Sequence, residues 1–327
     1  GLGKTVQALA LLQSLRSRDT PVPGPCLVVC PASLCENWRR ETLRFAPDFK
    51  VQVHRGAKRA KQADAFTGVD LILVSYPLLA RDLALFQEMR FACVIGDEGQ
   101  HIKNSKSQVA KAMFALRADG RFLLTGTPVE NSLSDLRSLF KFLMPGYLAK
   151  VPAGLKPDER KWFEQRHLSQ AAPYILRREK SLVAPELPEI IEQVVYCEMR
   201  EAQRGLYDAV HQQTEKDMLD LAGGGANEGR MRMAVFAQLL KLRQVCSEPR
   251  LVDEKLRKED SAKLETFLEI LDDAMAGGHR LLVFSQFVQV LKKIRQELEA
   301  REVGFCYLDG QTKDRMAQVD RFQINDS

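Results

Sequence analysis

Five short apolar segments at similar intervals constrain the fold of this chain more than any other feature of its sequence. They are LVVC at 27–30, VQVH at 51–54, LILVS at 71–75, CVIG at 93–96 and FLLT at 122–125. Each is continuous and β-rich, as expected for strands that are buried on both faces of a parallel sheet. The first 145 residues are therefore expected to form one sheet.

Amphipathic helical patterns lie between these segments, over about 6–16, from Ser33 onward, and over about 107–116. Ser33 and Glu36 have the spacing of a capping box, which predicts that a helix begins there. The alternation of strands and helices predicts a doubly wound α/β domain. In such a domain, ligands bind at the carboxyl ends of the strands.

The rest of the chain divides by composition. Residues 150–260 are rich in Lys, Arg, Glu, Gln and Leu, with one strand signal at 190–196 and a glycine-rich break at 223–227 between expected helices. After 261 the α/β rhythm returns, with helices over about 262–276 and 288–301 and strands at 281–284 and 305–308. We expect a first α/β lobe at 1–149, a helical insertion and connector at 150–260, and the start of a second, incomplete α/β lobe at 261–327.

Composition excludes few classes of protein. A length of 327 residues suits two domains, and no apolar run approaches the ~20 residues that span a bilayer. The net charge of +5 permits a polyanionic partner, but it equally fits a solvated surface. The seven cysteines form no C-x-x-C motif, which favours reduced buried thiols over zinc or disulfides.

The chain opens with the end of a phosphate-binding loop, Gly1-Leu2-Gly3-Lys4-Thr5. Glycines let backbone N–H groups approach a phosphate, a lysine reaches the β and γ phosphates, and a hydroxyl ligates Mg²⁺. The motif is short enough to arise by chance, so it needs a second element on another strand.

That second element is the pair Asp97 and Glu98, which follows the apolar segment at 93–96. Asp97 is expected to hold Mg²⁺, and Glu98 to orient and deprotonate an attacking water. A third element, Thr125-Gly126-Thr127, leaves the last apolar segment, where its hydroxyls could sense the γ phosphate. The simpler interpretation of the second element is a solvated acidic pair, and that of the third is an ordinary Gly-Thr-Pro turn.

Beyond these elements, the chain resembles the Swi/Snf family of helicase-like DNA translocases in superfamily 2. The resemblance runs through collinear blocks along essentially the whole chain: GLGKTVQ at 1–7, LVVCPASLCENWRRE at 27–41, LILVSY at 71–76, GDEGQHIKN at 96–104, LLTGTPVENSLSDLRSLFKFLMPG at 123–146, ILRREK at 175–180, LPEIIE at 187–192, LRQVCSEPRLV at 242–252, SAKLE at 261–265, LLVFSQF at 281–287 and LDGQTKDR to VDRFQ within 308–323. In that family the blocks build two RecA-like P-loop lobes with parallel sheets and helical protrusions.

The resemblance implies ATP and Mg²⁺ as cofactors and assigns roles to individual residues. ATP would be bound by Gly1, Gly3, Lys4 and Thr5, and Mg²⁺ by Thr5 and Asp97. Gln100 would couple the nucleotide to lobe movement. The link between hydrolysis and DNA would be made by Thr125, Gly126 and Thr127. Pro31, Ser33, Ser75 and Tyr76 would lie along the nucleic-acid groove of the first lobe, and Ser285 and Gln286 along that of the second. Trp38 is expected to pack in the core rather than stack on a base.

The chain departs from the family pattern in two respects. Gln100 replaces the histidine of many relatives. The second lobe ends before the motifs that supply its arginine finger, so we expect residues 1–327 alone to bind ATP weakly and to hydrolyse almost none.

The expected function is ATP-driven translocation on double-stranded DNA, which displaces or remodels DNA-bound proteins such as transcription or repair complexes. Basic clusters at 55–61, 103–111, 177–180 and 241–243 suit phosphate contact, or simply a soluble surface. The alternatives are a strand-separating RNA or DNA helicase and a non-hydrolysing DNA-binding scaffold. No membrane partner is expected, and the expected location is the cytoplasm, on the nucleoid in a bacterium, or the nucleus in a eukaryote.

Overall fold

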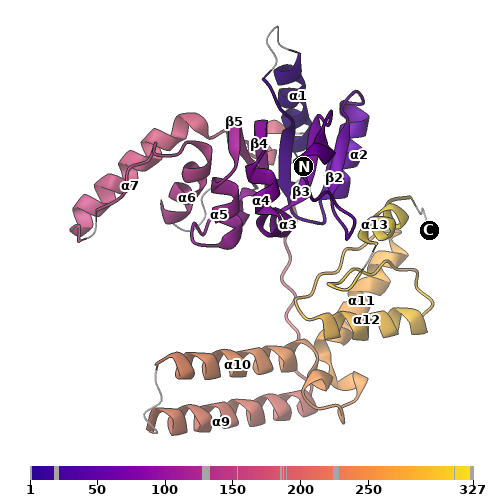
Figure 1. The fold of residues 1–327 in the computed structure, drawn as a ribbon. Coiled ribbons are helices and arrows are strands. Elements are labelled where there is room, and N and C mark those ends of the chain that lie inside the picture. The colour runs from indigo at the N-terminus through magenta and orange to yellow at the C-terminus, as the bar shows by residue number, and fades with distance from the viewer. Residues whose placement is uncertain are drawn as a thin grey trace. The chain divides into compact units, whose positions relative to one another are not determined.

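The computed structural model describes residues 2–17, 22–126, 133–152, 154–184, 186, 188, 190–223, 228–312 and 314–324. The chain folds into two compact units, residues 1–189 and 190–327, and each is described by itself (Figure 1). Among the described residues, no helix is both long and apolar enough to cross a membrane.

The first unit is built on a parallel sheet of five strands in the order β2-β3-β1-β4-β5. The strands are β1 (Cys26–Cys30), β2 (Val51–His54), β3 (Leu71–Ser75), β4 (Arg90–Asp97) and β5 (Arg117–Leu124), so all five expected strands are confirmed. Strand β1 lies between β3 and β4, which makes it the point where the strand order reverses. Open α/β sheets bind ligands outside the carboxyl ends of the strands at such a point.

Helices cover both faces of this sheet (Figure 1). The helices of the first unit are α1 (Lys4–Arg16), α2 (Cys35–Phe45), α3 (Tyr76–Arg81), α4 (Leu83–Gln87), α5 (Gln108–Phe114), α6 (Leu133–Leu143), α7 (Pro157–Ala171) and α8 (Lys180–Val183), with 3₁₀ turns η1 (Ala63–Phe66), η2 (Gly99–Ile102) and η3 (Ala172–Tyr174). One core contains Leu9, Leu12 and Trp38 from α1 and α2, and the other contains Leu79 and Met113 from α3 and α5. Alternate side chains of the buried strands fill the two cores, which explains their continuous apolar character.

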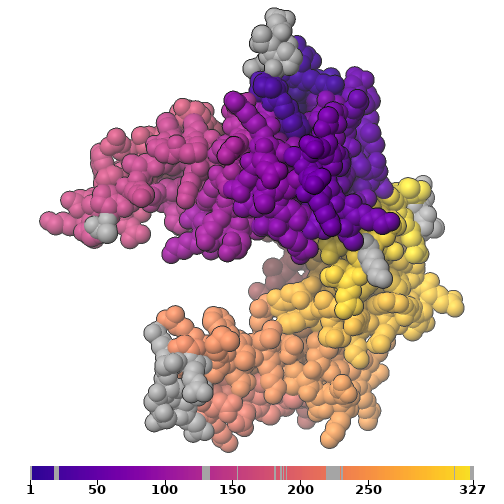
Figure 2. All heavy atoms as spheres, viewed as in Figure 1, coloured from indigo at the N-terminus to yellow at the C-terminus, as the bar shows by residue number. Residues whose placement is uncertain are grey.

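Helix α7 stands out from the body of the first unit at its surface (Figure 2). Its Trp162 is 53% exposed, whereas Trp38 of α2 is 1% exposed.

The expected capping box at the start of α2 is wrong. The helix begins at Cys35 with Leu34 as its N-cap, and it has no side-chain cap. Ser33 lies in the preceding turn, which the Leu34 N–H closes by donating to the Pro31 carbonyl oxygen (2.8 Å). Glu36 accepts hydrogen bonds from Arg39 instead.

The second unit begins with a helical hairpin, α9 (Glu201–Gly223) and α10 (Glu228–Ser247), as the glycine-rich break predicts. The buried Gln203 near the start of α9 donates to the Val245 carbonyl oxygen near the end of α10 (2.8 Å), so the two helices are antiparallel. Residues 224–227 of the break lie outside the described residues.

Beyond the hairpin lie η4 (Pro249–Leu251), η5 (Lys258–Asp260), α11 (Ala262–Ala276), α12 (Val288–Ala300) and α13 (Arg315–Ile324). The expected helices over 262–276 and 288–301 are thus confirmed. Leu264, Leu268 and Leu271 of α11 pack against Ile294 and Leu298 of α12.

The three strands expected in this unit are wrong. Residues 190–196, 281–284 and 305–308 lie outside any helix or strand. Many of their apolar side chains are exposed, with Ile191 at 92% and Phe284 at 85%, while those at 305–307 are half-buried. A strand needs a neighbour to pair its N–H and C=O groups, and no ladder forms among the described residues of this unit.

An ion-pair cluster fixes the loop that follows β2. Asp82, between α3 and α4, accepts from Arg59 Nη2 (2.9 Å) and contacts His54 Nε2 (2.8 Å). The His54 side chain is fully buried, while those of Arg59 and Asp82 are 21% and 18% exposed. The hydrogen bonds from Arg59, and secondarily that from His54, lower the pKa of Asp82 from 3.8 to about 2.

We predict that Asp82→Asn lowers the free energy of unfolding by about 1–2 kcal/mol at pH 7, because charge-assisted hydrogen bonds in a half-buried cluster are lost. Asp119→Asn, which breaks the more exposed pair with Arg90, should cost less.

The pH dependence follows from the lowered pKa of Asp82. A carboxyl group with a pKa of about 2 when folded and 3.8 when unfolded stabilises the fold fully above 3.8 and loses this effect as the pH falls to about 2. Denaturant titrations should therefore show a constant difference between wild type and Asp82→Asn down to about pH 4, which shrinks below it. A difference that stays the same at pH 2.5 would contradict this assignment.

Candidate functional site

The first turn of α1 and the loop after β5 meet at the Lys4 ammonium group. A Cβ atom placed on Gly126 would lie 3.9 Å from Lys4 Nζ. Gly3, the N-cap of α1, has a φ of 69°, a left-handed conformation that glycine adopts at little cost. The free N–H groups of a helix N-terminus and a lysine directed at the same place suit an anion. Gly1 and Thr127, also expected here, lie outside the described residues.

Asp97 is the last residue of β4 and is 7% exposed. Trp38 Nε1 donates to Oδ2 (2.8 Å), and the Glu98 backbone N–H donates to Oδ1 (2.9 Å). Burial raises the pKa of Asp97, while the hydrogen bond from Trp38 and the charge of Lys4 act in the opposite direction. The carboxylate is therefore oriented by fixed donors beside a cation.

Glu98, Gln100 and Thr125 form a hydrogen-bonded chain across two strand ends. Gln100 Nε2 donates to Glu98 Oε2 (2.8 Å), and Thr125 Oγ1 donates to Gln100 Oε1 (3.0 Å). Glu98 has a φ of 53°, a left-handed conformation that is unfavourable for a residue with a side chain. Such backbone conformations persist where the surroundings impose them, and they concentrate at functional sites. The structure thus brings together the residues expected from the second and third elements.

The side chains of Tyr76 and Ser75 are buried inside the protein and do not lie on its surface. Tyr76 is 1% exposed, and its hydroxyl donates to the Asp97 carbonyl oxygen (2.7 Å). Its ring stacks on His101, with centroids 4.9 Å apart, and Ser75 is 5% exposed. This burial does not fit direct contact of the two side chains with nucleic acid. The expectation rested on sequence position, which does not show which way the chain turns.

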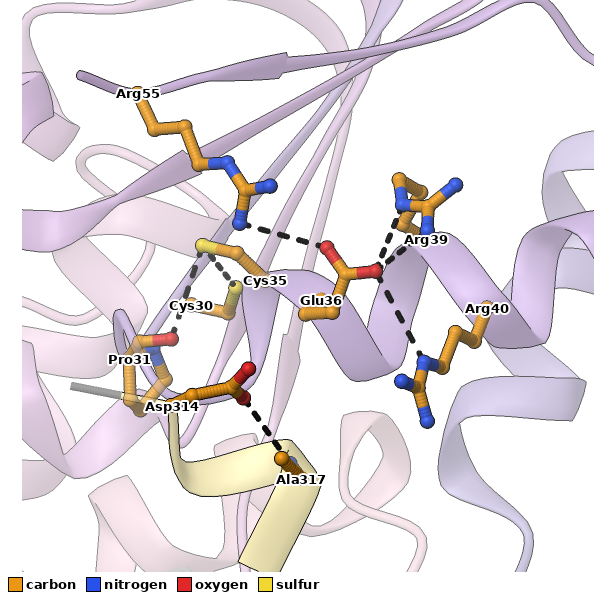
Figure 3. Close-up of polar contacts among 9 residues, drawn as sticks. All are labelled: Cys30, Pro31, Cys35, Glu36, Arg39, Arg40, Arg55, Asp314 and Ala317. Atoms are coloured by element: carbon orange, nitrogen blue, oxygen red, sulfur yellow. Dashed lines mark hydrogen bonds and ion pairs between the residues drawn. The ribbon is translucent and has the colours of Figure 1, made fainter. Parts of the chain in front are cut away.

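The turn after β1 holds the other expected nucleic-acid residues of the first unit. Ser33 is exposed and Pro31 is half-buried. Figure 3 shows this turn with Cys35 and Glu36 of α2 and with Arg55, whose Nη1 lies 3.4 Å from Glu36 Oε2.

In the second unit, Gln286 accepts a hydrogen bond from Arg243 Nη2 (2.7 Å), and Ser285 Oγ accepts from the Phe287 N–H (3.1 Å). The Asp314 side chain accepts from the Ala317 N–H (3.0 Å) in the first turn of α13 (Figure 3).

Several basic residues singled out for phosphate contact have protein partners. Arg59 binds Asp82, and Arg177 Nη2 lies 3.4 Å from Glu179 Oε1. Arg178 donates to Gln7 Oε1 (2.5 Å) on α1, so it braces the helix that carries Lys4.

Sequence reasoning placed Trp38 correctly in the core but missed its polar role. Periodicity shows which face of α2 is buried, and it does not show what lies opposite the indole N–H. Only the strand order, which sets β1 and its following helix beside β4, brings Trp38 to Asp97. A buried Trp normally finds a partner for this N–H, and that rule was the available signal.

Comparison with known proteins decides the family. The model of the SNF2-related domain matches residues 1–251. The chain belongs to this family. Its relatives include an ATP-dependent helicase of Mycoplasma pneumoniae, described as uncharacterized, at 32% identity over 98% of this chain and 31% of the relative. The ISWI chromatin-remodeling complex ATPase ISW1 of Saccharomyces cerevisiae is 28% identical over 100% of this chain and 31% of the relative.

Among solved structures, this SNF2-family chain is similar to the Sulfolobus solfataricus SWI2/SNF2 ATPase core in complex with dsDNA. The TM-score is 0.52 at 30% identity, over 100% of this chain and 70% of the other. The α/β fold with a parallel sheet agrees with that likeness. The chain spans about a third of the length of the curated relatives it matches.

We predict an energetic coupling between Trp38 and Asp97 of about 1.5–3 kcal/mol, because a buried hydrogen bond to a carboxylate is lost when either partner is removed. A double-mutant cycle with Trp38→Phe and Asp97→Ala, measured by denaturant unfolding, isolates this term from the cost of the smaller ring.

Trp162→Phe is the matched control, since that indole is half exposed and should couple to Asp97 by nearly zero. Additive effects of Trp38→Phe and Asp97→Ala would mean that the hydrogen bond does not hold the carboxylate.

Proposed function

We propose that this SNF2-family chain is part of the ATPase core of a motor that translocates along double-stranded DNA and displaces or remodels bound proteins. The observation that carries the proposal is the arrangement of Lys4, the buried Asp97 and the Glu98–Gln100–Thr125 chain at one edge of the sheet. An anion-binding helix end beside two carboxylates matches what phosphoryl transfer to water requires.

The residues present fit a Mg²⁺–ATP complex. The helix N-terminus and Lys4 offer donors to phosphate oxygens. Thr5 and Asp97 offer hydroxyl and carboxylate oxygens, the ligands that Mg²⁺ prefers. Mg²⁺ would neutralise charge on the β and γ phosphates when bound. Trp38 and the Glu98 N–H fix the Asp97 carboxylate before the ligand arrives, so binding needs little reorganisation.

Glu98 is the group proposed to take a proton from the attacking water. Its Oε2 accepts from Gln100, which leaves the remaining acceptor positions of the carboxylate for that water. Gln100 connects Glu98 to Thr125, and Thr125 adjoins Gly126 beside Lys4. A structural change that follows loss of the γ phosphate near Lys4 can therefore be transmitted to Glu98 through one hydrogen-bonded chain. This path supports the coupling role proposed for Gln100, Thr125, Gly126 and Thr127.

Duplex DNA is the proposed track. The related Sulfolobus core was solved with dsDNA, and chromatin-remodelling ATPases are among the relatives. The turn that contains Pro31 and the exposed Ser33 is the proposed nucleic-acid contact of the first unit. Ser285 and Gln286 are the separately proposed contacts of the second unit. Transcription or repair complexes are the proposed displaced proteins.

We predict that duplex DNA raises the ATP hydrolysis rate of the full-length protein more than RNA of equal length does. The stimulation should fall as salt rises, because phosphate contacts release counterions. Steady-state rates with duplex, RNA and no nucleic acid at two salt concentrations provide the measurement. Stimulation by RNA alone, accompanied by strand separation, would favour a helicase instead.

We predict that Lys4→Ala and Glu98→Gln, made in the full-length protein, separate ATP binding from turnover. Lys4→Ala should weaken ATP binding, because a charge-assisted contact to phosphate is lost in the ground state. Glu98→Gln should preserve binding and lower kcat by ~10²–10⁴-fold, because a general base acts mainly in the transition state. Nucleotide titration and single-turnover hydrolysis measure the two effects; equal losses of affinity in both variants would remove Glu98 from this role.

A further inference from the structure

Two cysteines that the proposed hydrolysis does not use lie together at the turn after β1. Cys30 ends β1, Cys35 begins α2, and their Sγ atoms are 3.5 Å apart (Figure 3). Cys30 is fully buried, whereas Cys35 retains 7% exposure. The two thiols are thus in contact, and Cys35 is the less deeply buried of the two residues.

The surroundings make the two thiols unequal. The hydrogen bond with Cys30 lowers the pKa of Cys35. Burial opposes this effect, and the guanidinium of Arg55 adds to it. The same hydrogen bond raises the pKa of Cys30. Cys35 also occupies the first position of a helix, where the backbone N–H groups favour a thiolate. The Cys35 sulfur is therefore the more nucleophilic of the two.

A second cysteine pair in the same sheet lacks these features. Cys26 and Cys93 are partners in the register of β1 and β4. Burial raises the pKa of Cys26 to about 11 and that of Cys93 to about 12. Both lie inside strands, away from a helix N-terminus, so they serve as an internal control.

We propose that Cys30 and Cys35 are an oxidant-sensitive dithiol, which hydrogen peroxide converts into a reversible disulfide. The Cys35 thiolate attacks one peroxide oxygen and becomes a sulfenic acid, releasing hydroxide. The Cys30 sulfur then attacks the Cys35 sulfur, and the sulfenic hydroxyl leaves with the Cys30 proton as water. Together the two sulfurs lose two electrons, and the two peroxide oxygens gain them.

Ring closure requires little movement, because a disulfide needs the sulfurs at about 2.05 Å and they start at 3.5 Å. The closed ring spans residues 30–35 and constrains the turn that contains Pro31 and Ser33. Because the closed ring stops this turn from adjusting to a phosphate backbone, we expect the oxidised protein to bind duplex DNA several-fold more weakly. This consequence rests on the proposed function, whereas formation of the disulfide does not.

The test maps the thiols of the full-length protein. Reduced and peroxide-treated samples are denatured in N-ethylmaleimide, digested with trypsin and analysed by mass spectrometry. Cleavage after Arg18 and Arg39 yields one peptide that contains Cys26, Cys30 and Cys35. The expected oxidised peptide carries one maleimide, on Cys26, lacks two hydrogens, and does not fragment between residues 30 and 35. Dithiothreitol should restore three maleimides, and Cys93 should be alkylated throughout.

Cys35→Ser should abolish the bond, and Cys26→Ser should leave it intact. The proposal would be overturned if Cys30 and Cys35 remained unreacted, if a Cys26–Cys93 bond formed, or if Cys35 became over-oxidised without forming a bond. Duplex binding is measured on the same samples. Equal binding by reduced and oxidised protein would refute the effect on DNA, and failure of the reduced protein to bind would instead count against the proposed function.

Discussion

The candidate site depends on a buried carboxylate held by an indole N–H. Asp97 sits at the end of β4, where burial disfavours its charge, and the Trp38 hydrogen bond offsets part of that cost. Trp38 connects it to α2, Tyr76 connects its backbone to α3, and Lys4 supplies a nearby positive charge from α1. Helices from both faces of the sheet thus converge on one residue, so their packing and the geometry of the site are linked.

Much of the first unit follows from its sequence, because continuous apolar segments specify buried parallel strands and the acidic pair marks a strand end. The same reasoning failed for 281–284 and 305–308, where the apolar pattern is present but no partner strand pairs with it among the described residues. An apolar pattern shows which side chains avoid water, but it does not show whether a neighbouring strand is present to pair with the segment.

Contacts between distant residues explain what sequence reasoning missed. The Trp38–Asp97 and Arg178–Gln7 hydrogen bonds join residues 59 and 171 positions apart, and no local pattern encodes such pairs. The left-handed backbone of Glu98 opposes its local preference by about 1–2 kcal/mol, so propensity alone would reject it. Gln100, which donates to the Glu98 carboxylate, and the buried Gly99 follow Glu98 and surround it.

The most direct test of this account is a crystal structure of the protein with Mg²⁺ and a non-hydrolysable ATP analogue. We expect the cation at Thr5 and at Asp97, directly or through one water, with the γ phosphate near Lys4 and the hydrogen bond from Trp38 Nε1 to Asp97 Oδ2 intact. A cation bound away from Asp97, or an Asp97 carboxylate that leaves Trp38 to reach it, would contradict the claim that the fold positions this group in advance.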